Sequence, residues 1–168
     1  MPWSFLRRAK EGVEMRTFLI DDRGPAGEYA HFLKAHREQL PLLELRVFSS
    51  WAAVTGPLAE SPPQLVLLDM HFDDGPIEDL CGDIEALAAS ERFGGDRARA
   101  EAQMRRHQGV FMVQALRDGD FAGPIILFGS LPKAQAERLL ERYAPLKIVE
   151  GLIFEAVRES LTWARDWR

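Results

Sequence analysis

Near-continuous apolar runs, each followed by a polar turn, most constrain the fold of this chain. Three such runs occupy residues 16–20, 65–68 and 124–128. Because they are predominantly apolar rather than alternating, they indicate strands that are covered on both faces. Two further strands are predicted at residues 43–48, where apolar and polar residues alternate, and at residues 147–149. Five strands of these kinds predict a sheet with a buried centre.

Helical patterns fill the intervals between these runs. In the first of them, Tyr29, Phe32 and Leu33 recur at helical spacing with charged residues between them. The predicted helices cover residues 28–40, 51–58, 109–117, 133–143 and 152–163. Strands that alternate with helices indicate a parallel sheet with helices on both faces and right-handed crossovers. The chain is therefore predicted to be an α/β protein.

One polar stretch, residues 76–108, does not fit this alternation. It is predicted to form two helical pieces, at residues 77–90 and 96–107, joined by a glycine-rich turn into a short hairpin. With this stretch treated as an insert, residues 16–168 are expected to form a single domain. Residues 1–15 precede the first apolar run and are expected to be an N-terminal arm.

Composition argues against several classes of partner. The formal net charge of -5 disfavours a general nucleic-acid binder, because such proteins neutralise phosphates with basic residues. No run approaches the roughly 20 apolar residues that a membrane helix needs, so no membrane association is expected. The single cysteine, Cys81, cannot form an internal disulfide, which fits a cytoplasmic protein.

Three carboxylates follow two of the apolar runs: Asp21 and Asp22 after the first, and Asp69 after the second. Sites in parallel sheets form outside the carboxyl ends of the strands, so these side chains are expected to meet. Carboxylate oxygens suit Mg²⁺, and a cation also lets a carboxylate attack a phosphoryl donor by offsetting their repulsion. Acids at strand ends are also common as turn formers and caps, but the combination with Asp69 favours a site.

At these residues the chain resembles the receiver domain of bacterial response regulators, the CheY-like domain of two-component signalling. The resemblance rests on residues 18–22, 65–75 and 109–130, and on the separation between the acid pair and Asp69. It covers residues 16–164 apart from the insert. It implies a flavodoxin-like (βα)5 fold, doubly wound, with strand order 2-1-3-4-5.

By this resemblance, Asp69 is the phosphoryl acceptor. Asp22 would contact Mg²⁺ directly, Asp21 would help through a water, and His71 would contribute its backbone carbonyl. The phosphoryl group would come from a histidine kinase or a phosphotransfer protein. Output would be contact with a downstream protein rather than enzyme activity, and homodimer formation is left open.

Two positions depart from the family's pattern. The fourth strand of a receiver usually ends in Thr or Ser, but Gly129 aligns there and Ser130 comes one residue late. The fifth strand usually ends in Lys, but Glu150 aligns there, and Lys147 lies at the strand's other end. A glutamate at this position adds negative charge beside the aspartates. Phosphorylation at Asp69 is thus expected to be slow, short-lived or uncoupled from the usual switch.

Other functions stay open at this point. A pseudo-receiver that signals by binding alone is supported by Gly129 and Glu150. A small Mg²⁺-dependent phosphatase is a third hypothesis, although no Asp-x-Asp arrangement follows the first strand. Flavin binding by a flavodoxin-type fold is disfavoured further, because no Ser/Thr/Gly-rich phosphate loop follows that strand.

Overall fold

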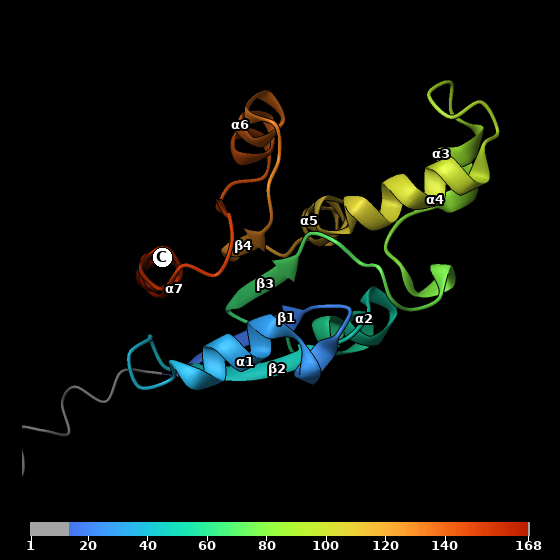
Figure 1. The fold of residues 1–168 in the computed structure, drawn as a ribbon. Coiled ribbons are helices and arrows are strands. Elements are labelled where there is room, and N and C mark those ends of the chain that lie inside the picture. Colours follow the sequence, from blue (N-terminus) through green and yellow to red (C-terminus); the bar gives the residue numbers. More distant parts are fainter. Residues whose placement is uncertain (1–13, 168) are drawn as a thin grey trace, which may run out of the picture.

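The computed structural model describes residues 14–167 and contains a five-stranded parallel sheet (Figure 1). In chain order the strands are β1 (Met15–Ile20), β2 (Leu43–Phe48), β3 (Leu65–Asp69), β4 (Ile125–Phe128) and β5 (Leu146–Val149). Their order across the sheet is β2-β1-β3-β4-β5, which confirms the predicted order 2-1-3-4-5. Met15 belongs to β1, and residues 1–13 of the predicted arm lie outside the described residues.

Helices cover both faces of the sheet, as predicted. They are α1 (Glu28–Ala35), α2 (Trp51–Glu60), α5 (Gln108–Asp118), α6 (Lys133–Arg142) and α7 (Phe154–Asp166). Successive side chains of a strand point to opposite faces, so Val66 and Leu68 of β3 join the core formed with α2, α5 and α6. Leu65 and Leu67 join the second core, formed with α1 and α7. All four are fully buried, which explains the uninterrupted apolar run.

The strand register places the residues that follow β1, β3, β4 and β5 at the same end of the sheet, beyond the carboxyl ends of the strands. Ile20 pairs with Leu68, Asp69 with Phe128, and Phe128 with Val149. The residues that follow these strands therefore lie at similar positions along the strand direction. These residues are Asp21, Met70, Gly129 and Glu150.

The polar stretch at residues 76–108 contains two helices, α3 (Ile84–Ala89) and α4 (Arg97–Arg106), which contact each other and extend beyond α5 (Figure 1). We refer to residues 84–106 as the α3–α4 pair. The prediction of a helix from residue 77 was wrong over its first half, where only the 3-10 turn η3 (Ile77–Asp79) forms. Gly82 interrupts it with a φ of 119°, and the Asp83 side chain then caps the start of α3.

The first predicted helix is also shorter than expected. It follows the 3-10 turn η2 (Gly24–Ala26) and ends at Ala35 rather than at residue 40. The residue that ends the helix is His36, whose ring lies between those of Phe32 and Phe154. Further along the chain, Pro41 disfavours a helical conformation at the residue before it. Among the helices of the described residues, none has the length and apolar character to cross a membrane.

Candidate functional site

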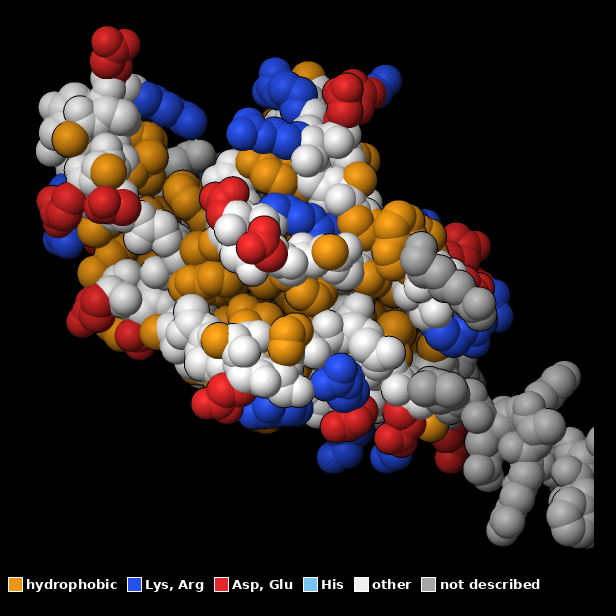
Figure 2. All heavy atoms as spheres, turned by 180° about the vertical axis from the view of Figure 1, so that it is seen from behind, with side chains coloured by type: hydrophobic (Ala, Val, Ile, Leu, Met, Phe, Trp, Pro, Cys, Tyr) orange, Lys and Arg blue, Asp and Glu red, His pale blue; other side chains and the backbone are white. Residues whose placement is uncertain are grey.

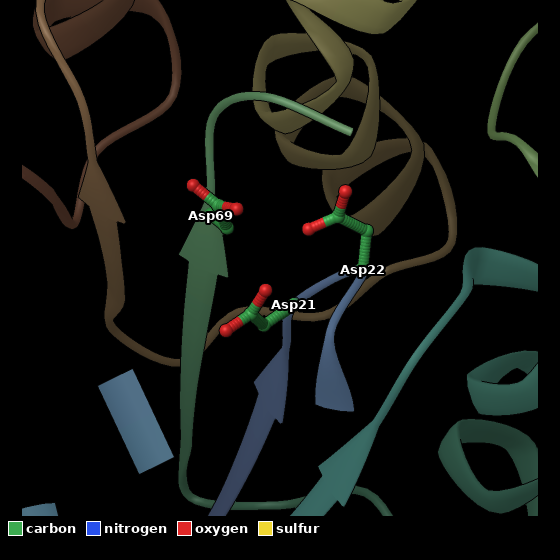
Figure 3. A group of neighbouring side chains, drawn as sticks. All are labelled: Asp21, Asp22 and Asp69. Carbon is green, nitrogen blue, oxygen red and sulfur yellow. The ribbon is translucent and has the colours of Figure 1, made fainter. Parts of the chain in front are cut away.

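The structure brings the three predicted carboxylates together. Asp21 and Asp22 follow β1, and Asp69 ends the neighbouring strand β3. One carboxylate oxygen from each residue lies within 4.8 Å of the others. Figure 3 shows the three side chains around a common space beyond the two strands. We call Asp21, Asp22 and Asp69 the acid cluster.

Burial and mutual repulsion make the acid cluster costly to ionise. Asp21 is only 2% exposed, and burial raises its pKa to about 6. Burial, followed by the charges of Asp21 and Asp22, raises the pKa of Asp69 to about 7. A backbone N–H from His71 acts in the opposite direction on Asp69, because it stabilises the charged form. Without a counter-charge, the cluster therefore holds a proton at pH values where isolated aspartates are fully ionised.

The hydrogen bonds of Asp21 leave one of its oxygens unused. Its Oδ1 accepts a hydrogen bond of 3.1 Å from the Arg23 backbone N–H. Its Oδ2 is buried and has no hydrogen-bond partner among residues 14–167. A Cβ at Gly27 would overlap this oxygen, so the absence of a side chain there makes room for Asp21. A buried carboxylate oxygen without a donor is unfavourable unless another group satisfies it.

These features fit a divalent cation. Within the described part of the chain, none of the three carboxylates forms an ion pair with a basic side chain. Carboxylate oxygens together with waters suit Mg²⁺, and a bound cation would satisfy the unpartnered Asp21 oxygen. His71 is exposed, and its backbone N–H, rather than its ring, lowers the pKa of Asp69. The metal role of its carbonyl stays a prediction.

Comparisons with known proteins identify the fold. No family model matches the chain, and no curated protein matches its sequence. The chain is similar to the solved structure of the signal receiver domain of a Vibrio parahaemolyticus protein assigned as the Luxo repressor. The TM-score is 0.52, the match covers 91% of this chain and 94% of that chain, and sequence identity is 14%. This chain has the receiver-domain fold.

In this receiver fold, position 129 has no room for the Thr or Ser side chain that usually ends the fourth strand of a receiver. A Cβ at Gly129 would lie 2.5 Å from the Cβ of Met70, which is closer than such atoms approach. Ser130 is exposed and donates its hydroxyl hydrogen bond to Glu150 at 3.2 Å, rather than to the acid cluster.

Glu150 and Lys147 each interact with a side chain outside the acid cluster. Glu150 is exposed, and the charges that act most strongly on Asp69 are those of Asp21 and Asp22. The ammonium group of Lys147 lies 5.1 Å from the centre of the Trp163 ring, on the side of the sheet that α7 covers. Lys147 thus contacts an aromatic ring and does not stand in for the usual lysine.

Tyr29 is a site residue that sequence patterning placed only among the apolar positions of a helix. Its ring stacks on Phe128, with the ring centres 4.8 Å apart. Its hydroxyl lies beside Asp69, where hydrogen bonding lowers the pKa of that carboxyl. Burial and the Asp69 charge raise the pKa of Tyr29, so its hydroxyl stays protonated and can donate. No local sequence signal marks this contact.

A hollow in the surface lies at the opposite end of the sheet from the acid cluster. Its volume is about 710 Å³, and its lining includes Met15, Trp51, Leu58, Phe121 and Pro124. Apolar side chains gather on the face of the molecule that Figure 2 shows. The hollow shares no residue with the acid cluster, so size alone does not locate the candidate site.

Proposed function

We propose that this chain is a receiver of two-component signalling and that it accepts a phosphoryl group on Asp69. The observation that carries this proposal is the acid cluster, with its oxygens within 4.8 Å of one another at the strand ends of a receiver fold. That fold favours a signalling role over an enzyme activity of its own. We assign residues 16–168 to one receiver domain and place the protein in the cytoplasm.

Phosphoryl transfer to Asp69 requires a divalent cation, and the acid cluster could hold one. Asp21, Asp22 and Asp69, with the His71 carbonyl, would hold Mg²⁺, which neutralises the carboxylates and the incoming phosphoryl oxygens. An Asp69 carboxylate oxygen attacks the phosphorus of a phosphohistidine on a histidine kinase or phosphotransfer protein. The new O–P bond forms as the P–N bond breaks, and the imidazole keeps the electron pair. The resulting aspartyl phosphate would alter contact with a downstream protein.

A second candidate function has its own support. Gly129 leaves no space for a hydroxyl side chain, and the Ser130 hydroxyl is bonded to Glu150. Both observations favour a pseudo-receiver, in which partner binding does not depend on phosphorylation. The two functions share a fold and a cation site, and they differ in whether a phosphoryl group on Asp69 changes the rest of the molecule.

An amide NMR titration separates these functions. Mg²⁺ is added first and beryllofluoride, which mimics a phosphoryl group on aspartate, is added second. For a phosphorylated receiver we expect saturable shifts that need both Mg²⁺ and Asp69, so that Asp69→Ala removes them. Asp73→Ala is the matched control, because it removes an exposed carboxylate nearby and keeps the backbone N–H that bonds Asp22.

The outcomes are distinct. Beryllofluoride shifts that extend beyond the acid cluster in the wild type and in Asp73→Ala, but not in Asp69→Ala, would support phosphorylation. A response to Mg²⁺ with none to beryllofluoride would contradict phosphorylation and support the pseudo-receiver. Absence of any Mg²⁺ response at the acid cluster would contradict the proposed metal site.

A further inference from the structure

The loop that follows Asp69 is hydrogen-bonded to the acid cluster on one side. The backbone N–H groups of Asp73 and Asp74 both donate to Oδ2 of Asp22, at 2.8 and 3.0 Å. We call residues 72–75 the acceptor loop. A carboxylate has two oxygens, so these bonds orient Asp22 while its second oxygen is left for other ligands. The acceptor loop therefore determines how Asp22 faces Asp21 and Asp69.

The same loop is bonded to α4 on its other side, through Arg105. The Arg105 guanidinium donates to the backbone carbonyls of Phe72, Asp74 and Gly75, at 3.4, 3.5 and 2.9 Å. The Nε of Arg105 donates to Glu101 at 3.1 Å. The Arg105 side chain is only 19% exposed. In addition, the Arg105 backbone carbonyl accepts a 2.9 Å hydrogen bond from the Phe72 N–H. One residue thus bonds three carbonyls and one N–H of the acceptor loop.

The end of α4 that carries Arg105 is itself held in place by hydrogen bonds. The fully buried Gln108 side chain accepts from the Cys81 N–H at 2.5 Å and donates to the Cys81 carbonyl at 3.1 Å. The Gly109 N–H donates to the Met70 carbonyl at 3.0 Å, directly after β3. The junction between α4 and α5 is therefore fastened to the end of β3 and to the segment before α3. Arg105 holds the acceptor loop from a well-anchored position.

We propose that Arg105 is a positioning residue of the acid cluster: by holding the acceptor loop, it orients Asp22 for a divalent cation and makes the α3–α4 pair respond to cation binding. Hydrogen-bond partners of a ligating carboxylate strongly influence metal affinity, which is the physical reason for the first part. The cation half of this inference rests on the proposed function. The hydrogen bonds of the acceptor loop do not.

The second part follows from linkage. If Arg105 couples the α3–α4 pair to the cation site, cation binding must in turn change the environment of α4. The positions usual for readout at β4 and β5 contribute little here, because Gly129 carries no hydroxyl and the Glu150 carboxylate accepts its hydrogen bond from the exposed Ser130. The α3–α4 pair is thus the element through which the state of the acid cluster would reach a partner.

The experiment is an amide NMR titration with Mg²⁺ alone, on the wild type, Arg105→Ala, Arg105→Lys and Arg106→Ala. We expect Arg105→Ala to weaken Mg²⁺ affinity about tenfold and to remove the Mg²⁺-dependent shifts in α4, while shifts at Asp21 persist. Arg105→Lys should lose most of the affinity too, because one ammonium group cannot bond three separated carbonyls. Arg106→Ala is the matched control, since Arg106 is exposed on the same helix turn and should behave as the wild type.

Hydrogen exchange in the absence of metal gives an independent measurement. Arg105→Ala should exchange the Asp73 and Asp74 amides at least several-fold faster than the wild type and Arg106→Ala. A purely structural role for Arg105 would lower the unfolding midpoint but leave both the Mg²⁺ affinity of the folded protein and these local exchange rates unchanged. Arg105→Lys serves where Arg105→Ala does not fold.

Failure of the proposed function can be told apart from failure of this inference. A wild type without Mg²⁺ shifts at the acid cluster contradicts the proposed cation site, and unchanged amide exchange in Arg105→Ala contradicts the positioning role by itself. A wild type that binds Mg²⁺, together with an Arg105→Ala variant of equal affinity and equal α4 response, overturns the inference and leaves the proposed function standing.

Discussion

At the end of β4, the backbone of Gly129 runs directly against Met70 at the end of β3. The close approach places a hypothetical Cβ at Gly129 within 2.5 Å of the Met70 Cβ and 3.0 Å of its Cγ. The Cβ of Met70 is fixed by the backbone, so the contact cannot be relieved by rotating a side chain. The missing hydroxyl is consequently a property of the packing at this position as well as of the residue type.

Restoring a hydroxyl at this position is expected to destabilise the protein. Gly129→Ser should lower the free energy of unfolding by about 1–3 kcal/mol, because the added atoms overpack the Met70 contact. Urea denaturation measures this change. Ala122→Ser is the control, since it adds the same hydroxyl at an exposed position just before β4 and should stay within about 0.5 kcal/mol of the wild type. A Gly129→Ser variant as stable as the wild type would show that β3 and β4 can separate here.

Two connections at the far end of the sheet depend on one arginine of α5. The Arg117 guanidinium donates to the carbonyls of Phe121 and Gly123, before β4, and of Tyr143 and Pro145, before β5. It is partly buried, and burial lowers its pKa. Because these two connections lead into adjacent strands, the contact fixes where β4 and β5 begin and hence where their carboxyl ends lie.

Removal of this side chain should weaken the whole β4–β5 region. We expect Arg117→Ala to lower the free energy of unfolding by about 3 kcal/mol, since it leaves several partly buried carbonyls without donors. Arg138→Ala provides the control, because Arg138 is exposed on α6 and the change should stay within about 0.5 kcal/mol. Chemical denaturation measures both variants, and equal midpoints would contradict the role of Arg117.

For the molecule as a whole, the acid cluster couples folding to protons. The folded chain holds the pKa of Asp21 at about 6 and that of Asp69 at about 7, against a value of 3.8 for an unperturbed aspartate. Between pH 3.8 and about 7 the folded state therefore binds protons that the unfolded chain has released. Stability from this source is complete below pH 3.8 and is lost as the pH rises through the folded-state values.

This linkage predicts that the metal-free protein becomes less stable as the pH rises from about 4 to about 7. Urea unfolding at successive pH values should show the decline, and saturating Mg²⁺ should reduce it by compensating the carboxylate charges. Asp69→Asn should decline less than the wild type, because it removes the group with the higher pKa and relieves its repulsion of Asp21. Parallel pH profiles for the wild type and Asp69→Asn would contradict the shifted pKa of Asp69.

Much of the architecture could be predicted because it depends on local patterning. Leu65 to Leu68 must be covered on both faces to keep four apolar side chains from water, and that requirement indicates a central strand in an α/β sheet. The positions of Asp21, Asp22 and Asp69 after their strands predicted that they would meet, since parallel strands end at one edge. The break at Gly82 was missed, because the pattern of apolar residues carries little information about φ.

Only the tertiary structure decided the contacts between residues distant in sequence. The Tyr29 hydroxyl beside Asp69, the Met70 contact that excludes a side chain at Gly129, and the bonds from Arg105 to the acceptor loop all join separate elements. Each depends on side-chain directions and distances that no local pattern encodes. The sequence by itself determined that the apolar strand runs are covered on both faces and which strand ends carry acids. The three-dimensional packing determined which neighbours act on those acids, because hydrogen bonding and charge interaction depend on distance in space.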